Sequence, residues 1–122
     1  MRKFIRGFGY AFNGLLHACK TQLNFWVHLV CAFIVVLLGY MLHLSTAEWL
    51  WIALAIGLVL VAELLNTAIE LLVDLVSPEY NKKAGLIKDM CAASVLVTAI
   101  TALFIGLIIF VPKLLVLIHH AA

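Results

Sequence analysis

Charged residues are scarce in this chain. Asp, Glu, Lys and Arg together make up only 11% of its 122 residues, whereas ordinary soluble domains contain about 25%. Hydrophobic residues make up 66%, and the mean hydropathy is +1.19. A soluble domain of this length buries only roughly two-thirds of its surface, so it cannot hide so much apolar area. The composition excludes an ordinary soluble protein and indicates a single integral membrane domain over residues 1–122.

The sequence also lacks the common phosphate-binding and metal-binding motifs. It contains no GxxxxGK[ST] and no kinase-type glycine-rich loop, and Gly85 is isolated. Its three cysteines, Cys19, Cys31 and Cys91, show no CxxC spacing, which favours small packed residues over a disulfide or a metal site. Any nucleotide site must therefore be of an unusual kind.

Long apolar runs predict three transmembrane helices in an all-α fold. The expected spans are residues 27–44, 49–76 and 86–117. Either Ser45 or Thr46 can cap the second span, where Glu48 suits the positive helix start. Pro112 can break the third span. The segment "PEYNKKAGLIKD" is the one strongly polar loop.

Residues 1–24 predict an amphipathic helix that lies on the membrane surface. Its apolar residues recur close to every fourth position, and polar residues fill the other positions, with a basic side that suits anionic headgroups. The apolar positions are Phe4, Phe8, Phe12, Leu15 and Cys19.

The basic residues predict a cytoplasmic N-terminus in a multi-pass protein. Lys113 alone falls near the opposite side, and cytoplasmic segments carry the excess of Lys and Arg. The residues on the cytoplasmic side are Arg2, Lys3, Arg6, Lys20, Lys82, Lys83 and Lys88.

Five polar residues of the second span fall on one face of the helix. With Glu63 at 0° and about 100° per residue, Asn66 lies near −60° and Glu70 near −20°. Thr67 then lies near about +40° and Asp74 near about +20°. Counted along the helix from the start of the span, Glu63 lies within the cytoplasmic half of the bilayer core, Glu70 near its edge and Asp74 among the headgroups.

An acid in the bilayer core costs about 2.5–3.5 kcal/mol, so this face should meet protein or water. A polar seam that fixes helix packing is one interpretation, with Asn66 and Thr67 bonding across an interface. A functional site is favoured because three acids share the face. Carboxylates that hold Mg²⁺ and a lysine that holds phosphate would suit a phosphorylated ligand. Positive-inside topology alone explains Lys82 and Lys83, but Lys88 stands beside an acid at the membrane end of a span.

The run "ELLNTAIELLVD", followed by "SPEYNKKAGLIKDM" and "AASVLV", resembles the signature of the small prokaryotic diacylglycerol kinase and undecaprenol kinase family. The upstream "GYAFNGLLHA" resembles the surface helix of that family, and "NFWVHL" is similar to its undecaprenol kinase branch. The resemblance covers nearly the whole chain. It implies a homotrimer in the bacterial cytoplasmic (inner) membrane, with active sites shared between protomers. It also implies ATP-dependent and Mg²⁺-dependent phosphorylation of a lipid alcohol, diacylglycerol or undecaprenol, and no nucleic acid partner.

The resemblance also assigns roles to residues. It implies that Glu63 is the general base, that Glu70 is a Mg²⁺ ligand, and that Asn66 and Asp74 line the site. The implied nucleotide contacts are Lys3, Tyr10, Gln22, Glu70, Glu79, Tyr80, Asn81, Lys88 and Asp89.

Gln22 departs from the family pattern. Many members carry a Glu there as a second metal ligand, and an amide ligates Mg²⁺ through its carbonyl without adding charge. Two alternatives stay open: a proton-coupled transporter, in which Glu63 would bind protons and substrate in turn, and a non-catalytic scaffold related to the kinases.

Overall fold

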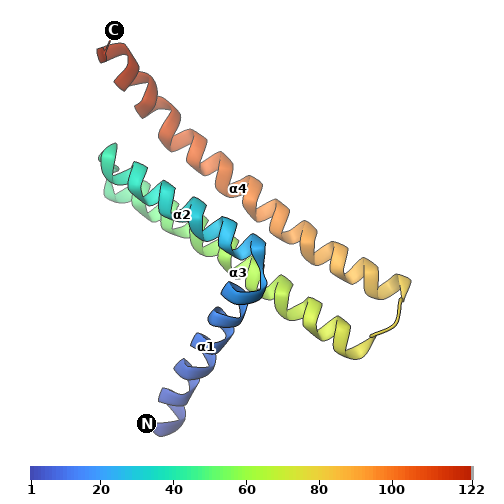
Figure 1. Ribbon diagram of the computed structural model, residues 1–122. Coiled ribbons are helices and arrows are strands. Elements are labelled where there is room, and N and C mark those ends of the chain that lie inside the picture. Colours follow the sequence, from blue (N-terminus) through green and yellow to red (C-terminus); the bar gives the residue numbers. More distant parts are fainter. Residues whose placement is uncertain (122) are drawn as a thin grey trace.

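The computed structural model describes residues 1–121 as four helices (Figure 1). Three of them are long and apolar enough to cross a membrane, so the prediction of an all-α chain with three spans is confirmed. The helices are α1 (Arg2–Thr21), α2 (Leu23–Met41), α3 (Thr46–Val76) and α4 (Lys82–Ala121).

Helix α3 is the centre of the arrangement, because α2 packs against its first half and α4 lies along it (Figure 1). Among the described residues, α2 and α4 do not pack on each other. Most large apolar side chains remain on the outside, as expected for helices that face lipid. One cluster of buried residues joins α3, α4 and the turn after α2 near the start of α3: Leu44, Ile52, Ile109 and Phe110.

The turn between α2 and α3 is tightly packed. The indole ring of Trp49 lies directly against Gly39, where an added Cβ would stand 2.7 Å from Trp49 Cη2. The same ring lies 5.1 Å, centroid to centroid, from Tyr40. His43 has a φ of 49°, a left-handed conformation in which histidine is enriched. This conformation stops α2 at Met41, whereas the apolar run predicted an end at Leu44.

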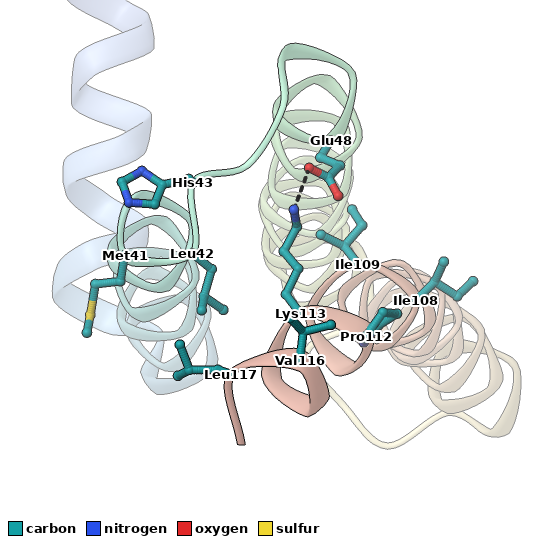
Figure 2. Close-up of a pocket in the computed structure, with 10 residues that line it drawn as sticks. All are labelled: Met41, Leu42, His43, Glu48, Ile108, Ile109, Pro112, Lys113, Val116 and Leu117. Atoms are coloured by element: carbon teal, nitrogen blue, oxygen red, sulfur yellow. Dashed lines mark ion pairs between the residues drawn. The ribbon is translucent and has the colours of Figure 1, made fainter. Parts of the chain in front are cut away.

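Helix α3 begins with a capping box. Glu48 N donates to Ser45 Oγ, and Ser45 N donates to Glu48 Oε2. Of the two residues predicted as caps, Ser45 therefore has this role. The same carboxylate oxygen lies 3.1 Å from Lys113 Nζ, and Figure 2 shows Lys113 reaching from α4 toward Glu48 across a pocket of about 490 Å³. This ion pair joins α3 to α4 at the end of the bundle opposite the polar loop.

Two expectations for the ends of the helices need correction. The break expected near Pro112 is wrong, because α4 continues through this proline. Membrane helices tolerate proline where local adjustments satisfy the freed carbonyl. Helix α4 also begins at Lys82 rather than Leu86, since Asn81 Oδ1 accepts hydrogen bonds from Lys83 N and Ala84 N. Hydropathy identifies the part of a helix that suits a membrane, and the cap determines where the helix begins.

A sharp corner separates α1 from α2, and α1 leaves the bundle there (Figure 1). Gln22 is extended, with φ −111° and ψ 108°. Across the corner, Trp26 Nε1 donates to the Cys19 carbonyl, while Ala18 and Phe25 are almost fully buried. These contacts fix the direction in which α1 departs.

Candidate active site on the polar face of α3

The polar face of α3 changes from buried to exposed along the helix. Glu63 and Thr67 are 3% and 6% exposed and are the buried polar residues among the described part of the chain. Asn66 and Glu70 are half-buried, and Asp74 is exposed. In Figure 1 the last part of α3 extends beyond α2 and is accompanied by the start of α4. The face therefore begins inside the bundle and ends at the polar loop.

Glu63 contacts a residue that sequence reasoning left without a role. His28 Nε2, on α2, lies 3.2 Å from Glu63 Oε1. Thr67 Oγ1 donates to the Glu63 backbone carbonyl, which leaves the carboxylate free for other partners. Among the described residues, no Lys or Arg lies within ion-pair distance of Glu63. The histidine is thus the one basic side chain against this acid in the described structure.

One turn further along α3, Asn66 and Glu70 form a pair. Asn66 Nδ2 donates to Glu70 Oε1 at 3.1 Å. The other end of the amide, Asn66 Oδ1, is buried and has no hydrogen-bond partner in the described structure. A buried oxygen without a partner is uncommon in folded proteins. The pair therefore contains a carboxylate and an amide oxygen, and this oxygen can still accept a hydrogen bond or bind a cation.

Asp74 and Lys88 connect the exposed end of the face to α4. Their carboxylate and ammonium groups form an ion pair between exposed side chains. The lysine that the sequence placed beside an acid at the membrane end of a span is thus bound to an acid of the neighbouring helix. Asp89, the next residue of α4, is exposed.

The loop between α3 and α4 is short and open. Ser77 Oγ donates to the Glu79 carbonyl, and the side chain of Tyr80 is 95% exposed. Asn81, predicted as a nucleotide contact, uses Oδ1 to cap α4. Its side-chain amide nitrogen has no hydrogen bond with another described residue. The loop therefore offers an aromatic ring, an acid and an amide donor to a ligand from the solvent side.

The residues predicted on α1 do not join this face within one chain. Figure 1 shows the start of α1 and the α3–α4 loop pointing away from each other. Among the described residues, no hydrogen bond or ion pair links Lys3 or Tyr10 to α3 or α4. The Gln22 amide donates to Thr21 Oγ1 at 3.4 Å and forms no described hydrogen bond with Glu70. Within the described residues, no group of three or more His, Cys, Asp or Glu is placed to hold a metal.

A groove of about 510 Å³ runs between α2 and α4 over the surface of α3. Apart from His28 and Cys31, all its lining residues are Ala, Gly, Val, Leu, Ile or Phe. His28 therefore has apolar groove on one side and the buried carboxylate of Glu63 on the other. The arrangement places an acid–histidine pair where an apolar space meets the polar face.

The family model described as prokaryotic diacylglycerol kinase matches residues 9–110, which contain the whole polar face and the α3–α4 loop. The chain belongs to this family. This match confirms the resemblance found in the sequence. The family is one of lipid kinases.

Curated relatives support the same placement over nearly the full length. An undecaprenol kinase of Bacillus subtilis is 40% identical over 114 residues, which is 93% of each chain. A diacylglycerol kinase of Synechocystis is 39% identical over 88% of this chain and 62% of its own length. A diacylglycerol kinase of Escherichia coli is 31% identical over 82% of both chains.

His28 is the residue of this site that sequence reasoning missed. It stands on a different helix from Glu63, and no spacing rule connects the two positions. One signal was nevertheless present. An ionisable side chain inside an apolar span is rare and usually has a partner or a function, and His28 falls within the expected span 27–44.

Proposed function

We propose that this protein transfers the γ-phosphoryl group of ATP to the hydroxyl of a membrane lipid alcohol. One observation carries the proposal: in a chain of a lipid kinase family, Glu63 is 3% exposed at the inner end of a polar face whose outer end is open to solvent. A lipid hydroxyl and a nucleotide approach from different directions. The buried end of the face suits the lipid hydroxyl, and its exposed end suits the nucleotide.

Glu63 acts as the general base in this proposal. Its carboxylate accepts the proton of the lipid hydroxyl as the hydroxyl oxygen forms a bond to the γ-phosphorus. The bond between the γ-phosphorus and the bridging oxygen of ATP breaks, and ADP leaves with that electron pair. Phosphoryl transfer depends mainly on positioning and charge stabilisation. Both partners therefore need to be held in line on the α3 face.

Glu70 and Asn66 are the proposed Mg²⁺ ligands. Mg²⁺ prefers oxygen ligands and is commonly held by one or two carboxylates together with substrate phosphates and water. The Glu70 carboxylate fits that donor set, and Asn66 Oδ1, which has no partner in the described structure, would join it if the amide turned so that Oδ1 instead of Nδ2 faced the ion. When bound, the ion neutralises charge on the β- and γ-phosphates of ATP.

The acceptor in this proposal is a lipid alcohol, and undecaprenol is the first to test. The relative that is 40% identical over 93% of both chains is named an undecaprenol kinase. Two further relatives, 39% and 31% identical, are named diacylglycerol kinases, which makes diacylglycerol the second acceptor to test.

In this proposal the protein is a homotrimer with shared sites, which would bring together the predicted nucleotide contacts that lie apart within one chain. Lys3 and Tyr10 lie on α1, which diverges from the α3–α4 loop (Figure 1). We propose that α1 lies on the cytoplasmic surface of the inner membrane, with the N-terminus in the cytosol. There α1 and Gln22 complete the nucleotide site of a neighbouring protomer. The remaining proposed contacts come from the loop and the first turns of α4: Glu79, Tyr80, Asn81, Lys88 and Asp89.

The test compares two acids of the same helix. Glu63→Gln removes the base, whereas Glu48→Gln changes an acid at the opposite end of α3. Transfer of label from [γ-³²P]ATP to undecaprenol or diacylglycerol is measured in detergent micelles. We expect Glu63→Gln to lower turnover by at least about 100-fold, the lower range for general base catalysis. Glu48→Gln should stay close to wild type. Wild-type turnover in Glu63→Gln, or equal losses in both variants, would contradict the assignment.

A further inference from the structure

The buried carboxylate of Glu63 has one basic partner in the described structure, and that partner lies on another helix. His28 Nε2 stands 3.2 Å from Glu63 Oε1, and the two side chains are 23% and 4% exposed. No described side chain forms a hydrogen bond or an ion pair with the second oxygen, Oε2, of this carboxylate. The contact therefore engages one oxygen of the acid and leaves the other available.

The surroundings of the pair make the contact costly to lose. The groove beside His28 is lined almost wholly by apolar side chains. An acid without a partner in such a place is strongly disfavoured. The carboxylate would then turn toward other polar groups of α3, and its catalytic orientation would be lost. A ring fixed on α2 restrains this motion because both helices are regular at these positions.

We propose that His28 is a positioning residue for the base Glu63. The imidazole Nε2–H holds Oε1, so that Oε2 faces the hydroxyl of the acceptor lipid. In the neutral ring a proton on Nε2 leaves Nδ1 as the acceptor. The apolar groove delivers the lipid to the same place, since His28 lines its polar end. This inference rests on the proposed kinase function and adds a second helix to its catalytic centre.

Positioning by His28 has a distinct kinetic signature. The lipid hydroxyl reacts with the oriented carboxylate, whereas ATP binds further along α3 and in the loop. Loss of the contact should therefore lower kcat and leave the KM for Mg-ATP nearly unchanged. Outer-shell partners that orient metal ligands, a comparable role, change metal affinity or activity by about 10–100-fold when they are mutated.

Three substitutions at one position separate positioning from packing. In His28→Gln the side-chain amide N–H reaches about as far as Nε2, in His28→Asn it reaches only to the Nδ1 position, and in His28→Phe the ring shape stays without any N–H. We expect Gln to retain most of the turnover. Asn and Phe should lower kcat at least about tenfold, the smaller loss expected for an orienting contact. His43→Asn, in the turn that follows α2, is the matched control for His28→Asn and should leave kcat unchanged, since asparagine also adopts the left-handed conformation of this position.

Each variant is purified in detergent, its thermal unfolding is recorded, and its kcat and KM are measured with a lipid alcohol and Mg-ATP. If His28→Phe does not fold, the Gln and Asn variants decide, because both are polar amides that differ in reach. Equal kcat values for Gln and Asn, or wild-type kcat in His28→Phe, would overturn the inference. A wild-type protein that phosphorylates no lipid alcohol would instead overturn the proposed function, so the two failures are distinct.

A double-mutant cycle adds a second readout. If His28 acts through the carboxylate, His28→Phe should cause no further loss in a Glu63→Gln background, because residues that act as a unit are not additive. Independent, multiplying losses in the residual transfer rate would contradict action through Glu63.

Discussion

The polar side chains at the first turn of α3 are hydrogen-bonded or ion-paired to one another. The polar side chains along its second half are only partly paired. Ser45 and Glu48 cap each other, and Lys113 completes the arrangement from α4 (Figure 2). Along the second half, Asn66 Oδ1 is buried without a partner in the described structure, and Glu63 has His28 beside only one of its two carboxylate oxygens. Folded proteins rarely leave such groups unpaired without a functional reason. We therefore call residues 45–48, where the pairs stabilise the fold, the closed end of α3. Residues 63–74, where polar groups are left for ligands, form its open end.

Substitution at the open end should affect activity most. Glu70→Gln removes a carboxylate from the proposed Mg²⁺ ligands and should lower turnover by at least about 100-fold, because metal charge stabilisation is worth several kcal/mol and each ~1.4 kcal/mol is tenfold. The Mg²⁺ concentration for half-maximal rate should also rise. Titration of the initial rate with Mg²⁺ measures both effects. An unchanged Mg²⁺ requirement would remove Glu70 from the metal site.

Substitution at the closed end should affect stability instead. In Gly39→Ala the new methyl group would meet Trp49 at 2.7 Å. Overpacking of this kind costs about 1–3 kcal/mol, partly offset by the better helix propensity of alanine. Thermal unfolding in detergent should shift to lower temperature, while turnover per folded protein persists.

Gly57→Ala is the matched control for Gly39→Ala, since an added Cβ there meets nothing within 4 Å in the described chain. Its Tm should stay the same or rise. Equal shifts in the two variants would mean that the Trp49–Gly39 contact does not stabilise this end.

A smaller gain in function is expected at the corner between α1 and α2. Gln22→Glu introduces the acid that the family resemblance implies as a second metal ligand, and the added charge should tighten Mg-ATP binding. The KM for Mg-ATP should fall severalfold, with little change in kcat. Gln22→Asn, which keeps the amide, serves as the control. If the KM stays the same with Glu at this position, Gln22 lies outside the metal site.

The ion pair at the closed end should matter least. Lys113→Met keeps the length and packing of the side chain but removes its charge. Partly exposed ion pairs contribute little to stability, so the Tm should fall by less than in Gly39→Ala. Thermal unfolding at low and high salt measures the contribution of the pair. A loss larger than that of Gly39→Ala would mean that the ion pair, rather than packing, closes this end.

Hydropathy predicted the fold well because lipid imposes a simple rule on long helices. The three spans and the capping role of Ser45 and Glu48 follow from apolar run length and local hydrogen-bonding chemistry. The ends of the helices were predicted less well. Asn81 starts α4 ahead of its apolar run, and the backbone of His43 stops α2 early.

The sequence likewise predicted some contacts of the candidate site and not others. Periodicity groups Glu63, Asn66 and Glu70, since these residues share one helix and their positions follow from its pitch. The partners His28 and Lys88 belong to other helices. Their contacts depend on how the helices pack, which no local pattern in one sequence reports.

The transfer assay on the wild-type protein tests the central claim most directly. Purified protein is incubated with [γ-³²P]ATP, with and without Mg²⁺, and with undecaprenol, diacylglycerol or a lipid that has no free hydroxyl. We predict labelled lipid phosphate only where both a hydroxyl and Mg²⁺ are present. ATP turnover that labels none of these lipids, or label that appears with the lipid lacking a hydroxyl, would contradict a lipid alcohol kinase.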